Sequence, residues 1–305
     1  MQTGFRARVV KDFRKNKRIY LLAVPMLVFL VVFKYLPILG NVVAFQDFKY
    51  RLGLMRSPFV GFKHFEAFLS GFYVERVITN TLVLSFLDIL FVFPAPILLA
   101  LLINEARGTA FKRTVQTISY MPHFISIIVF SGMIIDFLST NGIAGYFMEL
   151  LGLQRINLLM RPSAFRGIYT ISSIWKEMGW GAIVYLAAIT RVDTALYEAA
   201  DIDGASRMQK LRHITFPGIL PTVVMLLILK IGNMMNVGFE RIILLYNDIT
   251  METADIISSY VYRKGLIELN YSFSAAVDLF NSAINLILIL LANGVSRRLT
   301  ENSLW

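Results

Sequence analysis

The sequence predicts an all-α integral membrane protein with six transmembrane helices and both termini in the cytoplasm. Of its 305 residues, 56% are hydrophobic and only 16% are charged, whereas soluble domains average about 45–50% and about 25%. A soluble fold needs no such excess of apolar residues, because only its interior must be dry. The apolar residues also gather in long runs without the period-two alternation of a membrane β-barrel.

Six apolar runs reach the roughly 20 residues that a helix needs to cross a hydrocarbon core about 30 Å thick. Together they define one membrane domain over residues 19–293, between a basic segment at 1–18 and a short tail at 294–305. No internal repeat or low-complexity tract interrupts this domain. The expected spans are 19–37, 77–103, 118–138, 167–190, 216–237 and 273–293.

The net charge of +10 is interpreted as a signal of orientation. With the N-terminus in the cytoplasm, Lys and Arg are about twice as dense in the cytoplasmic segments as in the outer ones, as the positive-inside rule requires. This distribution removes the reason to expect a nucleic-acid partner. The first apolar run is too long for a signal peptide and no small-x-small cleavage site follows it, so we expect it to remain as a span.

The sequence contains no recognisable catalytic or metal-binding constellation. His64, His123 and His213 lie in three separate segments, and the H-E-x-x-H, G-x-S-x-G and P-loop patterns are absent. The lack of cysteine excludes disulfides and thiolate metal sites. We therefore expect no catalytic residue, no metal and no cofactor bound by this chain. A channel or a membrane enzyme remains the alternative class.

Polar and aromatic residues inside the last three spans predict a pathway for a polar solute. An ionisable residue near the bilayer centre is costly and normally faces protein or a water-filled path. Lys230 and Asn233 share a face of the fifth span, and Trp175 and Trp180 offer rings that stack on sugars. The alternatives are glue between helices for the polar stripe and an interfacial belt for the aromatic residues. The candidate pathway residues are Trp175, Lys176, Glu177, Trp180, Tyr185, Lys230, Asn233, Asn236 and Asp278.

The cytoplasmic loop at 191–217 predicts a compact elbow of two short helices. Asp193 or Thr194 suits the cap of a first helix that ends at Asp203, and Gly204 suits the left-handed position after it. A second short helix is expected up to His213, followed by the start of the fifth span near Pro217. On this pattern the elbow is either a docking element or an ordinary solvated loop.

The residues of this loop resemble the EAA signature of binding-protein-dependent ABC importer permeases. That signature reads E-A-A, three residues, G, nine residues and I-x-L-P, and this chain matches the spacing with Phe216 in place of the leucine. The resemblance implies that the loop is the coupling element that contacts an ATPase subunit. The residues that it assigns to coupling are Glu198, Ala199, Ala200, Asp201, Asp203, Gly204, Ala205, Ile214 and Pro217.

Further segments are similar to the polysaccharide-permease (LplB-like) branch of the maltose-permease type; among them are Tyr35-Leu36-Pro37, Tyr120-Met121-Pro122-His123-Phe124 and Gly238-Phe239-Glu240. This resemblance implies the type I importer (MetI-like) fold and import of an oligosaccharide. Lys176 and Lys230 make a uronate-containing sugar a candidate, although Glu177 and Asp88 offset their charge. The implied partners are a second related permease, two ATPase subunits that carry ATP and magnesium, and an extracytoplasmic binding protein, all at a bacterial cytoplasmic membrane. Import of an amino acid or a peptide by a permease of the same class is the alternative.

Overall fold

The computed structural model describes residue 13 and residues 15–300, so most of the basic segment at 1–18 and the end of the tail lie outside the described residues. Across these ranges the regular secondary structure is helical, apart from one isolated bridge between Gln46 and Phe59. The prediction of an all-α membrane protein is confirmed. The helices are α2 (Lys17–Leu30), α3 (Gly53–Arg56), α4 (Lys63–Leu69), α5 (Val74–Leu87), α6 (Pro94–Glu105), α7 (Thr109–Phe124), α8 (Ile127–Leu138), α9 (Ile143–Leu150), α10 (Pro162–Ile189), α11 (Thr194–Ile202), α12 (Arg207–Lys210), α13 (Phe216–Gly232), α14 (Phe239–Leu245), α15 (Met251–Ala254), α16 (Ile257–Tyr262) and α17 (Tyr271–Thr300).

Several of these helices join through π or 3-10 turns into longer rods. Five segments of the described chain are long and apolar enough to cross a membrane: Lys17–Phe45, Val74–Glu105, Ile127–Leu150, Arg207–Gly232 and Tyr271–Arg298. The fourth predicted span corresponds to α10, which has 28 residues. Lys176 and Glu177 in its middle make it less apolar than the other five.

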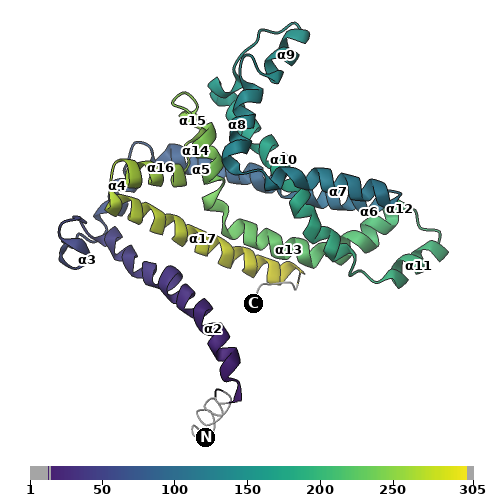
Figure 1. Ribbon diagram of the computed structural model, residues 1–305, viewed down its shortest axis with the longest axis horizontal. Helices are drawn as coiled ribbons and strands as arrows, with labels where there is room; N and C mark the ends of the chain where they lie inside the picture. The colour runs from purple at the N-terminus through teal and green to yellow at the C-terminus, as the bar shows by residue number, and fades with distance from the viewer. Residues whose placement is uncertain (1–12, 14, 301–305) are drawn as a thin grey trace.

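The third predicted span, 118–138, is not one helix, and the prediction is wrong on this point. α7 ends at Phe124 and α8 begins at Ile127, with Ile125 and Ser126 in extended conformation between them. Pro122 removes a backbone donor just before the break, and the Ser126 hydroxyl accepts a hydrogen bond from the Val129 N–H at 3.3 Å as the N-cap of α8. In Figure 1, α7 lies along α6 while α8 turns away toward α9.

One proline in each of three predicted spans does not break its helix. Pro37, Pro94 and Pro217 each lie two residues after a π turn, at Val31–Tyr35, Asp88–Val92 and Leu211–Thr215 respectively. Proline has no N–H for the carbonyl four residues earlier and its ring clashes there. A π turn moves the hydrogen bonds to i→i+5 and makes room for the ring. The fifth span therefore runs from Arg207, nine residues before its predicted start.

The long helices pack around α10. In Figure 1, α6 and α7 lie beside it, α13 and α17 run together below it, and α11 marks the end opposite α4 and α16. One buried cluster joins α6, α10 and α13 through residues such as Ile97, Tyr185 and Ile219. The backbones of α7 and α10 approach so closely that a Cβ on Gly179 would lie 1.9 Å from the Ser119 carbonyl oxygen. Such close approach is common in membrane helix pairs, where dispersion replaces the hydrophobic effect.

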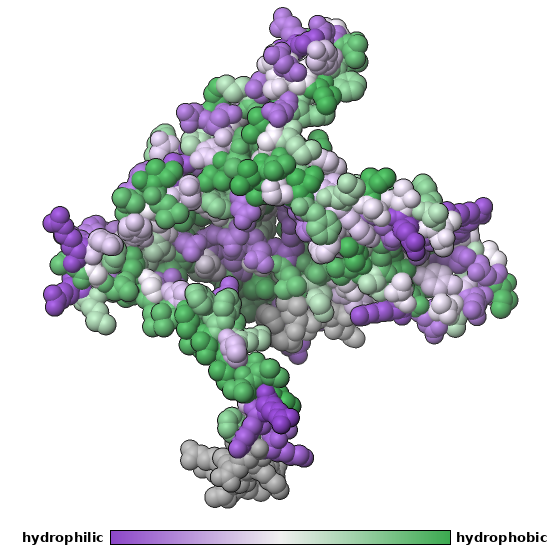
Figure 2. Space-filling view, in the orientation of Figure 1, coloured by the Kyte–Doolittle hydropathy of each residue, from purple (hydrophilic) through white to green (hydrophobic). Residues whose placement is uncertain are grey.

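The first helix stands apart from the rest of the molecule (Figure 1). None of the apolar window of Lys17–Phe45 is buried against the chain, and side chains such as Leu22 (80% exposed) face outward. In Figure 2, hydrophobic residues dominate the surface of this first helix. Hydrophilic residues gather instead near the centre of the molecular face shown in that view. Because the apolar side chains of this helix are not buried against the rest of the chain, we expect lipid or a neighbouring subunit to surround them.

A closed network of charged side chains fixes the helix ends near α16. The carboxylate of Asp255, fully buried, accepts hydrogen bonds from Arg76 at 3.2 Å, Arg263 at 2.7 Å and Ser259 at 2.8 Å. Burial lowers the pKa of the Arg263 guanidinium, but its hydrogen bond to Asp255 and the charge of that carboxylate outweigh burial and raise the pKa above its ordinary value. Asn80 extends the network, because it donates to the Asp255 carbonyl at 3.1 Å and accepts from Arg166 of α10 at 3.0 Å.

Candidate transport cavity and coupling elbow

A cavity of about 570 Å³ opens between the rod of α5 and α6, the middle of α10, and the end of α13 with the segment that follows it. Its lining mixes charged, polar and aromatic side chains with apolar ones. Six of the nine predicted pathway residues line it: Glu177, Trp180, Tyr185, Lys230, Asn233 and Asn236. The cavity is the candidate site.

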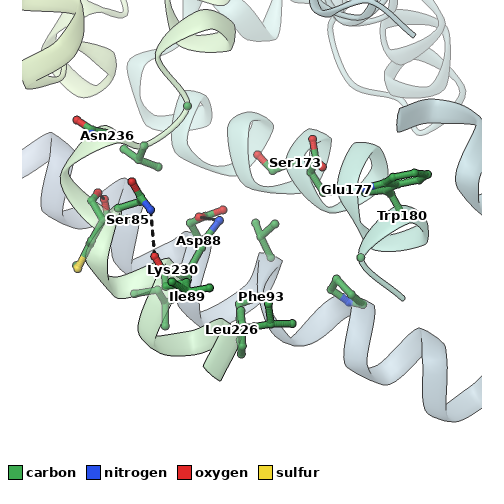
Figure 3. A pocket seen from close by; sticks show the side chains of 18 of the residues that line it. Ser85, Asp88, Ile89, Phe93, Ser173, Glu177, Trp180, Leu226, Lys230 and Asn236 are labelled. Atoms are coloured by element: carbon green, nitrogen blue, oxygen red, sulfur yellow. Dashed lines mark hydrogen bonds and ion pairs between the residues drawn. The ribbon is translucent and has the colours of Figure 1, made fainter. Parts of the chain in front are cut away.

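The π turn at Asp88–Val92 places a carboxylate at the cavity wall. The Phe93 N–H donates to the Asp88 carbonyl oxygen at 2.8 Å, five residues back, which is the π pattern. Asp88 is 7% exposed and forms an ion pair with Lys230, whose side chain is 39% exposed. The two lie next to each other in Figure 3. The ion pair explains how Lys230 is tolerated inside an apolar helix.

Trp180 lines the cavity on the side of α10 and is part of a small polar stack. Its ring lies parallel to that of His123, with centroids 4.7 Å apart and planes at 2°. The His123 Nδ1 lies 3.3 Å from a carboxylate oxygen of Glu177. Ser173, Glu177 and Trp180 follow one another along α10 in Figure 3. The last turn of α7 thus places His123 against the α10 side of the cavity wall.

The polar stripe predicted on the fifth span does not lie on one helix. α13 ends at Gly232, and Asn233 follows as its C-cap with φ −110°. Asn236 belongs to a 3-10 turn and accepts a hydrogen bond from Asn281 of α17 at 2.6 Å. Lys230, Asn233 and Asn236 nevertheless all line the cavity, because the chain bends around it after α13.

Three predicted pathway residues lie elsewhere. Lys176 is 7% exposed and its ammonium donates to the carbonyl oxygens of Pro122, His123 and Ile125 at 3.2, 3.3 and 2.7 Å. These carbonyls belong to the last turn of α7 and to the residue just after the helix, so Lys176 fastens the helix break to α10. Trp175 packs on Phe130 with centroids 5.2 Å apart. Asp278 is an exposed residue of α17 outside the cavity lining.

Arg241 also lines the cavity and was missed by the sequence reasoning. It follows the fifth apolar run by a few residues and was counted only among the basic residues of an outer segment. Its guanidinium donates to the Ser173 hydroxyl and lies 5.2 Å from the centroid of the Tyr169 ring. Only the return of α14 against α10 reveals this position, and nothing in the local sequence pattern signals it.

The first helix of the elbow and the turn after it have the local structure that the sequence predicts, whereas the predicted second short helix is continuous with the fifth span from Arg207. The Asp193 carboxylate accepts a hydrogen bond from the Ala195 N–H at 2.9 Å as the N-cap of α11. Gly204 has φ +72°, and the N–H groups of Gly204 and Ala205 donate to the carbonyls of Asp201 and Ala200 at 3.2 and 2.8 Å. This pair of bonds is a Schellman motif, which favours glycine at the left-handed position. The cap and the turn are confirmed.

Side-chain contacts join the elbow firmly to the fifth span. The Tyr197 hydroxyl lies 2.9 Å from that of Thr215, and Lys210 pairs with Asp201 at 2.6 Å. Glu198 itself is exposed, as are Ala199, Asp203 and Gly204, whereas Ala200, Ala205 and Ile214 are half-buried. The exposed face also carries apolar side chains, with Ile202 88% and Met208 70% exposed. α11 has no buried residue, so this knob is free to contact another protein.

Long apolar helices around a polar cavity, with an exposed elbow at one end, define an integral membrane transport protein. Residues 67–301 match the family of binding-protein-dependent transport system inner membrane components, and the chain belongs to this family. It has the MetI-like fold of ABC importer permeases.

The chain is similar to two proteins of Bacillus subtilis (strain 168). It is 42% identical over 293 residues to Protein LplB, covering 96% of this chain and 92% of that protein. It is also 42% identical over 303 residues to the polygalacturonan/rhamnogalacturonan transport system permease protein YteP, covering 98% and 94%. Among solved structures it resembles a chain of a bacterial ABC transporter involved in the import of the acidic polysaccharide alginate, with a TM-score of 0.90, 43% identity and coverage of 96% and 99%.

Proposed function

We propose that this chain is one of two related permease subunits of an ATP-driven importer for oligosaccharides in a bacterial cytoplasmic membrane. The observation that carries the proposal is the cavity, where hydrogen-bonding groups stand beside aromatic rings among membrane helices. Sugars are recognised by this combination, because their hydroxyls need polar partners and their apolar faces stack on rings. The relatives named for polygalacturonan and alginate transport support a uronate-containing sugar.

The elbow is the proposed contact with a cytoplasmic ATPase subunit. Its exposed face combines the Glu198 carboxylate with the apolar side chains of Ile202 and Met208. Because the helix that carries Lys230 runs unbroken from Arg207, a displacement of the elbow moves one wall of the cavity directly. Closure of two ATPases would thereby switch the cavity between inward and outward access, as a shift of packed helices.

The remaining partners follow from the same proposal. A second permease would complete the cavity, an extracytoplasmic binding protein would deliver the sugar, and ATP and magnesium would be held by two ATPase subunits rather than by this chain. The solved relative that is described in complex with an alginate pentasaccharide-bound periplasmic protein supports the binding protein as a partner.

Uptake into proteoliposomes tests the function. The transporter purified through this chain should import labelled alginate pentasaccharide or trigalacturonate only with ATP on the elbow side and binding protein on the other side. A channel needs neither, and a membrane enzyme would release a shorter product. Import of an amino acid or peptide without import of either sugar would favour the alternative substrate classes and overturn the sugar.

A variant of Gly204 tests the elbow. Valine at φ +72° is strained, so Gly204→Val should reduce substrate-stimulated ATP hydrolysis by about ten-fold or more, the effect of a loss of about 1.4 kcal/mol. Gly152 is a matched control, because it has φ +74° in the outer segment after α9. Gly152→Val should retain stimulation. Glu198→Lys should also lose stimulation, and wild-type stimulation in both elbow variants would exclude the elbow as the coupling element.

A further inference from the structure

Four acidic or basic side chains line the cavity, and three of them lie within ion-pair distance of a group that carries or can take up the opposite charge. Asp88 pairs with Lys230, and Glu177 lies within ion-pair distance of His123. For Arg241, no carboxylate lies within ion-pair distance in the part of the chain that the structure describes.

The surroundings of Arg241 leave its guanidinium incompletely bonded. The residue is 9% exposed, its Nη1 group donates to the Ser173 hydroxyl, and its Nε is buried without a hydrogen-bond partner among the described residues. A guanidinium offers five N–H donors and keeps its charge at every relevant pH. A neutral hydroxyl and the face of Tyr169 do not balance a buried charge, so an anionic partner is missing from this site.

The position of Arg241 is fixed before any ligand arrives. Gly238 begins the turn into α14 with φ +48°, and a Cβ there would lie 1.9 Å from the Tyr169 hydroxyl oxygen. Ile242, which follows Arg241 in the chain, is fully buried in the cluster that includes Tyr169. α14 is therefore locked against α10, and the guanidinium is held rigidly over the Tyr169 ring at the cavity wall. A rigid donor loses little freedom on binding.

We propose that Arg241 is a specificity-determining residue that binds the carboxylate of a uronate unit as the sugar passes through the cavity. This inference rests on the proposed function. The guanidinium presents paired N–H groups that match a carboxylate, Ser173 holds it in place, and Tyr169 supports it from behind. A uronate fits better than a bare anion, because the same cavity also offers partners for the sugar ring. The Asn236 amide can hydrogen-bond to a sugar hydroxyl, and the Trp180 ring can stack on the apolar face of the sugar. A neutral sugar leaves the guanidinium unpaired, so the site discriminates by charge.

Calorimetric titration of the intact transporter, without its binding protein, tests this site. The probes are trigalacturonate and its fully methyl-esterified form, which has the same shape without the charge. The wild type should bind the acid more tightly than the ester, and its affinity for the acid should fall as the salt concentration rises.

Arg241→Gln should weaken acid binding by about ten- to a hundred-fold and leave ester binding unchanged. Ser173→Asp should give the same loss, because it places a carboxylate beside the Arg241 guanidinium within the protein. Lys264→Gln, which removes a positive charge outside the cavity lining, is the control; the Lys264 side chain is 28% exposed.

Three results would overturn the proposal. The first is an equal effect of Arg241→Gln on acid and ester, or no effect on either. The second is dissociation of the permease pair in Arg241→Gln on size-exclusion chromatography, which assigns the missing carboxylate to the second permease instead. If the wild type binds neither probe the proposal also fails, and the uptake assay then shows whether the proposed function fails with it.

Discussion

Two sites of buried charge among the described residues, the Asp255 network and the cavity, both pair Asp with basic side chains but differ in completeness. Around Asp255 the carboxylate is fully buried and bonded to Arg76 and Arg263 at 3.2 and 2.7 Å. In the cavity, Asp88 is nearly buried while its partner Lys230 has a side chain 39% exposed. Arg241 has no ionic partner at all among the described residues. The first site is closed, and the second is left open on one side.

The difference follows from the local backbone at each site. The Asp255 network lies where α15, α16, α5 and α10 converge, so several elements supply donors at once. The cavity is instead bordered by irregular turns: the π turn at Asp88 and the end of α13 before Asn233. Such irregular backbone is tolerated at membrane depth where it lines a water-filled space. Closed networks hold the helices, and open ones are available to a solute.

The largest effect is expected at the closed site. Asp255→Asn removes the charge that two arginines share and leaves Arg76 and Arg263 unbalanced in a buried place. Breaking a buried ionic group in this way costs about 3–5 kcal/mol. The melting temperature of the purified transporter in detergent should fall clearly, with loss of assembled complex at physiological temperature. Asp248→Asn, at an exposed position, is the control. An unchanged melting temperature would show that the network around Asp255 is not what fastens these helices.

A smaller effect is expected from the pair in the cavity. Lys230→Met leaves Asp88 without its partner, but water in the cavity can solvate the carboxylate, so the cost should be about 1 kcal/mol or less, as for half-exposed pairs. Asp88→Asn should cost less still, because it leaves only the half-exposed ammonium unpaired. Melting temperatures of the two single variants and of the double variant measure the coupling. A loss for Lys230→Met as large as for Asp255→Asn would mean that the cavity is dry and would remove the distinction between the sites.

Local features of the fold and the elbow were predictable from sequence. The Asp193 cap, the left-handed Gly204 and the long apolar runs depend on residues within a few positions of one another, and their physics is local. The EAA spacing from Glu198 to Pro217 is also continuous in the chain. One helix boundary beside the elbow was predicted wrongly. A proline was taken as a boundary at 216–217, whereas a π turn absorbs it and the helix starts at Arg207.

The cavity itself was only partly predictable, because tertiary contacts decide which polar residues face it. Lys176 and Glu177 are adjacent in sequence, yet one fastens the end of α7 and the other lines the cavity. Arg241 enters the site through the return of α14, a contact between residues 68 positions apart. Periodicity along one helix carries no information on such a contact. Asn233 and Asn236 were identified on a helical face that does not exist, and the bend after α13 still brings them to the cavity.

The finest distinction between the two sites is access to water, and the absence of native cysteine allows it to be measured directly. Asn233→Cys, at an exposed residue of the cavity wall, should react with a charged water-soluble thiol reagent, and the rate should change when ATP drives the transporter between states. Ala254→Cys, at a fully buried position next to Asp255, should stay unreactive in every state. Mass spectrometry of the labelled chain gives both rates in one experiment, with little expected change in stability because the side chains are small. If Asn233→Cys were inert with every nucleotide, Lys230 and Asn233 would be structural residues like those around Asp255. The open site would then have to be sought elsewhere between the helices.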